Sequence, residues 1–281
     1  MVSTTQGRLV RASKSLEGCV MEIDWQLREA GPAGAERTVL LLPGGMASAG
    51  LYAEVMAEPA LAQTRLVAAT LPGQVGAPAL DIYTIEDNAR HVAKLASEVG
   101  ADVVVGFSNG ANVAVEMVVS GDFTGPVVLL GMSLSTKDEP AFFRAIVGST
   151  RVLGNLPMKL LAAGAASMVK RIPVSAERQS ELRAEFRRND PRDIRLGLRE
   201  YLRWLQRGDG RAERLCRADV PMWIVHTEKG DGGLTADERR TLEACPSAHV
   251  VTIPGAVFFL PNEIPERIAA LILDALASVG S

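Results

Sequence analysis

The stretch Val103-Val-Val-Gly-Phe-Ser-Asn-Gly-Ala-Asn-Val-Ala-Val115 determines the predicted fold of this 281-residue chain. It begins with an apolar, β-branched run that is typical of a strand buried on both faces of a sheet. The run ends in a G-x-S-x-G motif centred on Ser108 and is followed by a helical pattern. Glycines on both sides let the backbone turn sharply, so we expect Ser108 at the tip of a strand–turn–helix unit with its hydroxyl exposed. The helix that begins at Asn109 would direct its N-terminus at this site and favour negative charge there.

Similar apolar runs alternate with helical patterns on both sides of this stretch. Further strands are predicted at 38–42, 65–69, 126–130, 221–225 and 249–253, and the strand before Ser108 at 101–106. A looser alternation over 18–29 predicts an early antiparallel strand, and helices are predicted at 51–62, 84–99, 109–119, 236–244 and 264–279. Such alternation is the signature of a mostly parallel sheet with helices on both faces.

One region interrupts this alternation. Between residues 134 and 210 there are only helical patterns, separated by turn signals such as Asp190-Pro191. We therefore predict a core domain formed by 1–133 and 211–281, with an all-helical cap formed by 134–210. Arginines in the second half of the cap are interleaved with acids, which favours solvated, ion-paired helix faces over a nucleic-acid-binding surface.

Composition narrows the classes of partner. A net charge of −3 with 47% hydrophobic residues indicates a globular chain and gives no reason to expect nucleic acid or an anionic membrane as a partner. Three widely spaced cysteines predict neither a disulfide framework nor a metal site, and no motif calls for a cofactor. The N-terminus lacks a signal-peptide pattern, and the longest apolar stretch, 160–169, is about half of what a membrane span needs. We therefore expect a soluble, cytoplasmic protein that binds a small apolar molecule; its oligomeric state is not readable from the sequence.

With these motifs the chain resembles the α/β-hydrolase family, in the branch that carries a helical cap. The resemblance also rests on Leu71-Pro-Gly-Gln-Val-Gly76 and Ile253-Pro-Gly-Ala256, and it spans almost the whole chain. It implies an eight-stranded, mostly parallel sheet with Ser108 as nucleophile. It also implies an oxyanion hole, built from the backbone N–H of Asn109 and an N–H in the loop Pro43-Gly-Gly-Met-Ala-Ser48. Gly45 is the first candidate for that second donor, and Met46 the next.

The resemblance fails at the catalytic histidine. Family members carry it in a loop after the last strand, where this chain has Phe258. The three histidines of the chain lie elsewhere: His249 would open the last strand, and His91 would lie along a helix. Only His226 is predicted at the carboxyl end of a strand, the edge where parallel sheets bind ligands, which leaves it as a possible substitute base.

The acid of the triad is also displaced. The family pattern H-G-x-x-D corresponds here to His226-Thr-Glu-Lys-Gly230 followed by Asp231, which is the counterpart we predict. Glu228 and Asp138 are the alternatives, and a solvated loop carboxylate without a role is a further interpretation.

These motifs and the missing histidine leave two hypotheses for the function. Without an imidazole a serine hydroxyl is a poor nucleophile, so ordinary ester hydrolysis is not supported. The first hypothesis is an enzyme that acts on a small apolar carbonyl or ester compound through Ser108 and the oxyanion hole, as a hydrolase or as a lyase or cyclase. The second is a receptor-like binding protein in which Phe258 forms part of the pocket wall. A third reading, that Phe258 is an introduced substitution in an active hydrolase, stays open.

Overall fold

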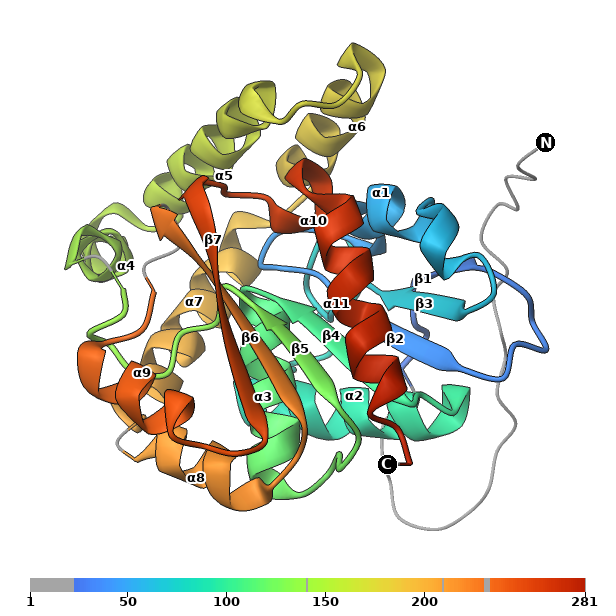
Figure 1. Ribbon diagram of the computed structural model, residues 1–281. Helices are drawn as coiled ribbons and strands as arrows, with labels where there is room; N and C mark the ends of the chain where they lie inside the picture. Colours follow the sequence, from blue (N-terminus) through green and yellow to red (C-terminus); the bar gives the residue numbers. More distant parts are fainter. Residues whose placement is uncertain (1–22, 140, 209, 230–232, 281) are drawn as a thin grey trace, which may run out of the picture.

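A single sheet forms the centre of the computed structural model, which describes residues 23–139, 141–208, 210–229 and 233–280. Its strand order is β1-β3-β2-β4-β5-β6-β7 (Figure 1). β1 is antiparallel to β3, and all other neighbours are parallel. The strands are β1 (Leu27–Ala30), β2 (Thr38–Leu42), β3 (Arg65–Ala69), β4 (Val103–Phe107), β5 (Val127–Leu130), β6 (Met222–Lys229) and β7 (Ala248–Ala256). The predicted fold class is confirmed, with seven strands among the described residues in place of the predicted eight.

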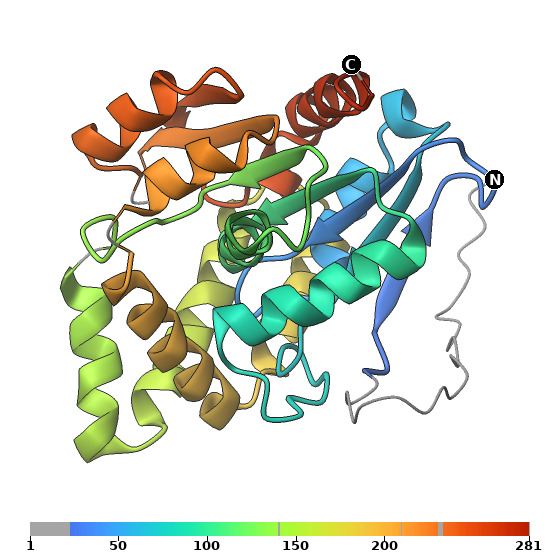
Figure 2. The same ribbon diagram turned by 90° about the horizontal axis from the view of Figure 1, so that it is seen from below.

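Both faces of the sheet are covered, which explains why its strands are apolar at nearly every position. In β2, Val39 and Leu41 belong to one core cluster, while Leu40 and Leu42 belong to the cluster on the opposite face. The cluster of Leu40 and Leu42 includes residues of helices α2 (Ile85–Val99), α3 (Asn109–Ser120), α8 (Arg211–Ala218) and α9 (Ala236–Glu243). The cluster of Val39 and Leu41 includes residues of α11 (Pro265–Ala277). Figure 2 shows α2 and α11 on opposite sides of the sheet.

The region predicted as one helix over 51–62 is broken into three short pieces. These are η1 (Ala49–Tyr52), α1 (Ala53–Met56) and η2 (Pro59–Leu61). Pro59 has no N–H to donate and restricts the residue before it, so a continuous helix cannot pass this point. The single-helix prediction was therefore wrong.

The last two strands run further than the sequence indicated. β6 and β7 pair up to Lys229 and Ala256, with an irregularity between Thr227 and Lys229. The residues Pro254 to Ala256, expected after the predicted strand 249–253, lie inside β7. A proline is tolerated there because β7 is the edge strand. The following Gly255 donates its N–H to Glu228 Oε2 at 2.9 Å.

Between β5 and α8 the chain forms four helices and a short 3₁₀ turn, which we call the helical segment. Its members are α4 (Ala141–Leu153), α5 (Leu156–Met168), η3 (Val169–Arg171), α6 (Ala176–Arg187) and α7 (Pro191–Gln206). The turn signal Asp190-Pro191 marks a helix start: Asp190 accepts a hydrogen bond from the N–H of Arg192, and Pro191 occupies the first turn. In the described part of the chain, no helix is both long and apolar enough to cross a membrane.

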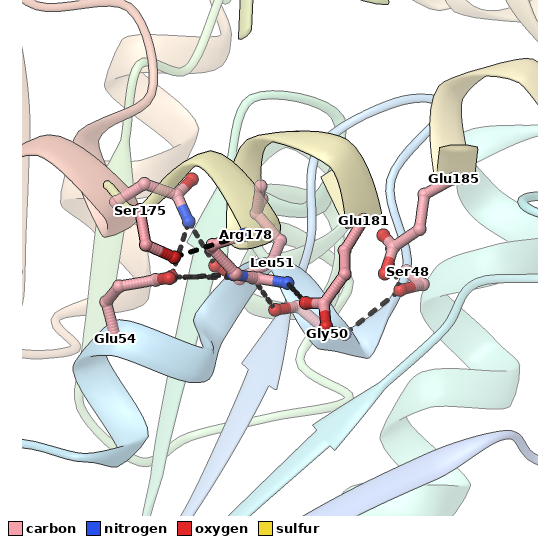
Figure 3. A network of polar contacts seen from close by, with 9 residues as sticks. Ser48, Gly50, Leu51, Glu54, Ser175, Arg178, Glu181 and Glu185 are labelled. Carbon is pink, nitrogen blue, oxygen red and sulfur yellow. Dashed lines mark hydrogen bonds and ion pairs between the residues drawn. The ribbon is translucent and has the colours of Figure 1, made fainter. Parts of the chain in front are cut away.

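An arginine on α6 fastens the helical segment to the core (Figure 3). Arg178 Nε donates to Glu54 Oε1 at 2.7 Å, and its Nη2 donates to the carbonyl of Gly50. Nearby, Ser48 Oγ donates to Glu185 Oε2 at 2.7 Å. These contacts hold α6 over the turn that follows the Pro43–Ser48 loop.

Candidate active site

Ser108 lies between β4 and α3 in a backbone conformation that a residue with a side chain rarely adopts. Its φ is 50° and its ψ is −115°. Its N–H donates to the carbonyl of Leu130 on β5 at 2.8 Å, which ties this strained residue to the sheet. Backbone strain of this kind persists only where the surrounding structure enforces it, and it is concentrated at functional sites.

The two glycines of the motif are required by close packing. A Cβ on Gly106 would lie 2.4 Å from the carbonyl oxygen of Gly110, and one on Gly110 would lie 2.3 Å from that of Leu42. Both contacts are with backbone, so no side-chain movement could relieve them. The glycines let α3 begin directly against β4 and the end of β2, and this turn presents Ser108 at the carboxyl edge of the sheet.

The loop after β2 lies against the same turn. A Cβ on Gly44 would be 3.3 Å from Cβ of Ser108, and one on Gly45 would be 3.8 Å from Cβ of Asn109. Asn109 is the first residue of α3, and the first N–H groups of a helix have no acceptor within the helix. The structure therefore brings the predicted donors Gly45, Met46 and Asn109 together around Ser108.

All four of these residues line one cavity of about 280 Å³. The loop after β3 and the start of α2 form another part of its wall, through residues such as Gln74 and Asn88. α5 and α7 of the helical segment complete it. α7 contributes one face, represented by Asp193, Ile194 and Leu198. The cavity is thus enclosed between the carboxyl edge of the sheet and the helical segment.

Two carboxylates in the cavity wall are each hydrogen-bonded to a tyrosine. Glu139 Oε1 accepts from Tyr201 Oη at 2.5 Å and from Ser133 Oγ at 2.8 Å. Asp193 Oδ1 accepts from Tyr83 Oη at 2.8 Å. Burial raises the pKa of Tyr201 well above its ordinary value, and the charge of Glu139 raises it further. Burial likewise raises the pKa of Tyr83 to about 12, with Asp193 adding to the shift. Both phenols therefore stay protonated at neutral pH and act as donors.

A series of hydrogen bonds connects Glu139 to the turn that carries Ser108. Ser133 donates its backbone N–H to Asn112 Oδ1 at 3.1 Å. Asn112 lies on α3 one turn after Ser108, and its own N–H donates to the Ser108 carbonyl at 3.1 Å. Glu139 and Tyr201 thus belong to the end of the cavity that contains Ser108.

A buried asparagine connects the helical segment to both loops beside the site. Asn189 Oδ1 accepts from the N–H of Val75, and its Nδ2 donates to the carbonyl of Met46, each at 2.9 Å. The same Nδ2 also contacts the carbonyls of Glu185 and Phe186 at the end of α6, each at 3.2 Å. Val75 and Met46 both have positive φ, 48° and 65°. Asn189 therefore holds two strained loop residues in place.

The histidines do not reach the cavity. All three lie in the described part of the chain, and none of them lines it. His226 is fully buried within β6, which continues beyond it, so its predicted place at a strand end was wrong. His249 stacks on Trp223 with ring centroids 5.0 Å apart. His91 lies on α2, where burial lowers its pKa.

The predicted acids are dispersed. Asp231 lies outside the described residues, and Glu228 is exposed and hydrogen-bonded to Gly255. Asp138 is buried and accepts the N–H groups of Leu134 and Ser135 at 2.7 and 2.9 Å. Burial raises the pKa of its carboxyl to about 6. Neither Glu228 nor Asp138 lines the cavity, and no group of three potential ligands in the described parts is arranged to hold a metal ion.

Phe258 lies outside the cavity, with 36% of its surface exposed. The N–H groups of Phe258 and Phe259 donate to Glu263 Oε1 at 2.9 and 2.7 Å. Phe259 contacts the helical segment instead, since its ring packs edge-on to Phe186 at 6.0 Å. The prediction of Phe258 as a wall of this cavity was therefore wrong: the bonds to Glu263 fix the turn so that the second phenylalanine faces inward.

The site thus combines the strained turn at Ser108, the Pro43–Ser48 loop and the helical segment. The sequence of the chain also matches a known family. Residues 39–271 fit the model of the alpha/beta hydrolase family. This chain belongs to that family. No curated protein is similar enough in sequence to match it.

Solved structures of other alpha/beta hydrolases superpose on most of the chain. A thermophilic esterase from Thermogutta terrifontis has a TM-score of 0.71 at 19% identity, covering 92% of this chain and 95% of its own. The enol-lactonase from Burkholderia xenovorans LB400 has a TM-score of 0.69 at 18% identity, covering 91% and 97%. A putative ancestral haloalkane dehalogenase has a TM-score of 0.69 at 19% identity, covering 93% and 99%. At these identities the similarity establishes the fold of this alpha/beta hydrolase and not its reaction.

Several cavity residues had no signal in the sequence. Glu139 follows a predicted strand and could have been considered beside Asp138. Tyr83, Asn189 and Asp193 come from separate segments and carry no motif of their own. Only the packing of α7 against the core brings them to the cavity.

Proposed function

We propose that this protein is an enzyme that activates the carbonyl group of a small substrate held in the cavity beneath the helical segment, which acts as its cap. In this proposal the Ser108 hydroxyl and the N–H of Asn109, with that of Gly45 or Met46, polarise the carbonyl oxygen. The observation that carries the proposal is that Ser108, on its strained turn, lines the same cavity as these donors. Donors fixed in advance around a developing oxyanion are among the largest contributions to catalysis.

The proposed reaction does not depend on a histidine. Loss of one member of a serine triad lowers turnover by roughly 10⁴- to 10⁶-fold. Among the described residues of the cavity wall, the side chains that can serve as a general base are the carboxylates of Glu139 and Asp193. We assign Glu139 as the base, because it belongs to the Ser108 end of the cavity and its hydrogen bonds from Ser133 and Tyr201 both go to Oε1. A carboxylate beside a polarised carbonyl suits removal of a proton from the adjacent carbon, as in a lyase or isomerase.

Deuterium exchange tests this proposal. A small methyl ketone such as 2-heptanone is incubated with the protein in D₂O, and NMR follows deuterium entering the carbons beside the carbonyl. We expect exchange above the buffer rate, and a loss of about 100-fold or more in Glu139→Gln. Ser108→Ala should also slow exchange, while Glu200→Gln, which removes a carboxylate of α7 that does not line the cavity, should leave it unchanged.

Two outcomes would refute the proposal. One is exchange by the wild-type protein no faster than in buffer. The other is rapid turnover of short p-nitrophenyl esters together with labelling of Ser108 by a fluorophosphonate, which would establish conventional hydrolysis instead.

A second candidate function is ligand binding without turnover. The absence of histidine from the cavity wall favours it, because the same pocket would then need no base. Retention of a bound ketone that is recovered unchanged and undeuterated would support this function over the enzymatic one.

A further inference from the structure

The charged groups in the cavity wall all have the same sign. Glu139 and Asp193 line it, and among the residues that the structure describes no lysine, arginine or histidine does. The tyrosines that donate to these carboxylates are neutral, so they orient the carboxylates without cancelling their charge. A negatively charged enclosure disfavours an anionic ligand and favours a cationic one.

The two carboxylates are found at different points along α7. Glu139 contacts α7 through Tyr201, whereas Asp193 lies in the first turn of the same helix. Tyr201 and Asp193 are separated by about 12 Å along the helix axis, at 1.5 Å per residue. Since the Tyr201 end contains Ser108, the Asp193 end is where the remote part of a substrate would lie.

Two amide side chains that line the cavity come from segments in contact with Asp193. A Cβ on Gly73, the neighbour of Gln74, would lie 3.7 Å from Cβ of Asp193, and Asn88 bonds to Thr84, the neighbour of the Tyr83 that donates to Asp193. Asn88 lines the cavity, is 7% exposed, and has no partner for Oδ1 among the described residues. Its orientation is fixed because Nδ2 donates to the carbonyl of Thr84 at 2.8 Å. Gln74, from the loop after β3, lines the cavity as well, and in the described structure its buried Oε1 is likewise without a partner. A buried acceptor without a donor costs free energy, which a ligand with N–H groups would recover.

Two exposed arginines lie near this end without lining the cavity: Arg192, and Arg188, whose Nη2 would lie 3.6 Å from a Cβ on Gly76. Arg192 adjoins Asp193 in sequence and acts electrostatically on Tyr83, but its side chain is exposed and is not part of the cavity wall. Asp193 therefore faces the cavity as the charge that a ligand would meet.

We infer that the cavity takes a substrate with a protonated primary amine at the end remote from its carbonyl, and that Asp193, Asn88 and Gln74 bind this ammonium group. The inference rests on the proposed function for the position of the carbonyl and makes the substrate class more specific. An ammonium group has a positive charge and three N–H donors, which matches one carboxylate and two amide oxygens. An apolar chain of the same length would leave both amide oxygens without a donor and bring no positive charge to Asp193.

Matched ketones test the inference. The probes are 8-amino-2-octanone and 2-nonanone, which differ in having an ammonium or a methyl group at the far end. Binding is measured by isothermal titration calorimetry at pH 7 and low salt. We expect the amine to bind about 10- to 100-fold more tightly. Asp193→Asn should reduce its affinity to near that of 2-nonanone and leave 2-nonanone unaffected. The variant keeps an oxygen that can accept from Tyr83, and an unchanged melting temperature would confirm that it is folded.

The control is Glu200→Gln, which removes one negative charge from α7 at a residue paired with Arg199 and Arg203 outside the cavity wall. Equal binding of the two ketones, or an equal loss of amine affinity in this control, would overturn the inference. The same titrations on Ser108→Ala separate the two proposals. If Ser108→Ala binds the amine more tightly than 2-nonanone but the wild-type protein shows no deuterium exchange, the proposed function alone is refuted. If the wild-type protein shows exchange but the amine is not preferred, this inference alone is refuted.

Discussion

Replacing Asn189 with alanine should destabilise the protein and loosen the loops around Ser108. The side chain is buried and belongs to the helical segment, yet it bonds to Val75 and Met46, which are 114 and 143 positions away in the sequence. Alanine leaves the Val75 N–H and the Met46 carbonyl without these partners. Both residues have positive φ, so nothing local would keep them in place.

The magnitude follows from the two groups that lose a partner. A buried polar group without a partner costs about 1–3 kcal/mol. Val75 is 1% exposed and would incur the full cost, whereas Met46 is half-buried and its carbonyl can recover part of it from water. We therefore expect the free energy of unfolding to fall by about 2–4 kcal/mol. Asn189→Asp should be at least as harmful at pH 7, because a carboxylate oxygen would then face three carbonyl oxygens.

Urea denaturation followed by circular dichroism measures this change. The matched control is Asn155→Ala at the start of α5, where the side chain makes no capping hydrogen bond and the loss should be within about 0.5 kcal/mol. Deuterium exchange into 2-heptanone provides a second readout, and we expect it to slow in Asn189→Ala even under conditions where the variant is fully folded. A change below about 0.5 kcal/mol together with an unaltered exchange rate would refute the role assigned to Asn189.

Two further predictions concern the motif glycine and a buried acid. Gly110→Ala should prevent stable folding, because the new Cβ would lie 2.3 Å from the carbonyl oxygen of Leu42. The control Gly148→Ala lies on α4 with no atom within 4 Å of the new Cβ, and it should raise the free energy of unfolding by about 0.5–1 kcal/mol. Melting temperatures of the two variants test this difference. Asp138 has its pKa raised from 3.8 to about 6, chiefly by burial, with Glu238 adjacent. The folded protein then binds this proton more tightly than the unfolded chain, so the contribution of Asp138 to stability falls as pH rises from about 4 to 6. Asp138→Asn cannot lose this contribution. Urea denaturation of both proteins across that pH range should show the free energy of unfolding of the wild type falling relative to that of the variant. Parallel pH dependence of the two proteins would contradict the raised pKa of Asp138.

Local patterns in the sequence were sufficient to predict the fold and the position of Ser108 on its turn. The strands 38–42 and 65–69 match β2 and β3, because strands covered on both faces must be apolar at almost every position. The G-x-S-x-G motif predicted the turn at Ser108 because the constraint on Gly106 is local: α3 begins so close to β4 that only glycine fits there, whereas Gly110 is required where α3 meets the end of β2.

The polar wall of the cavity was decided only by tertiary structure. Glu139 meets Tyr201 across 62 positions, and Tyr83 meets Asp193 across 110, through packing that no periodicity or motif encodes. The sequence predicted that Phe258 takes the place of the family histidine, but only the structure shows that His226 is enclosed within β6 and that Phe259 is the ring that faces α6. Apolar burial has a period that can be read along the chain, whereas a hydrogen bond between distant segments depends on where whole helices come to rest. The sequence by itself therefore determined the scaffold and Ser108, and the position of α7 over the sheet determined which groups surround them.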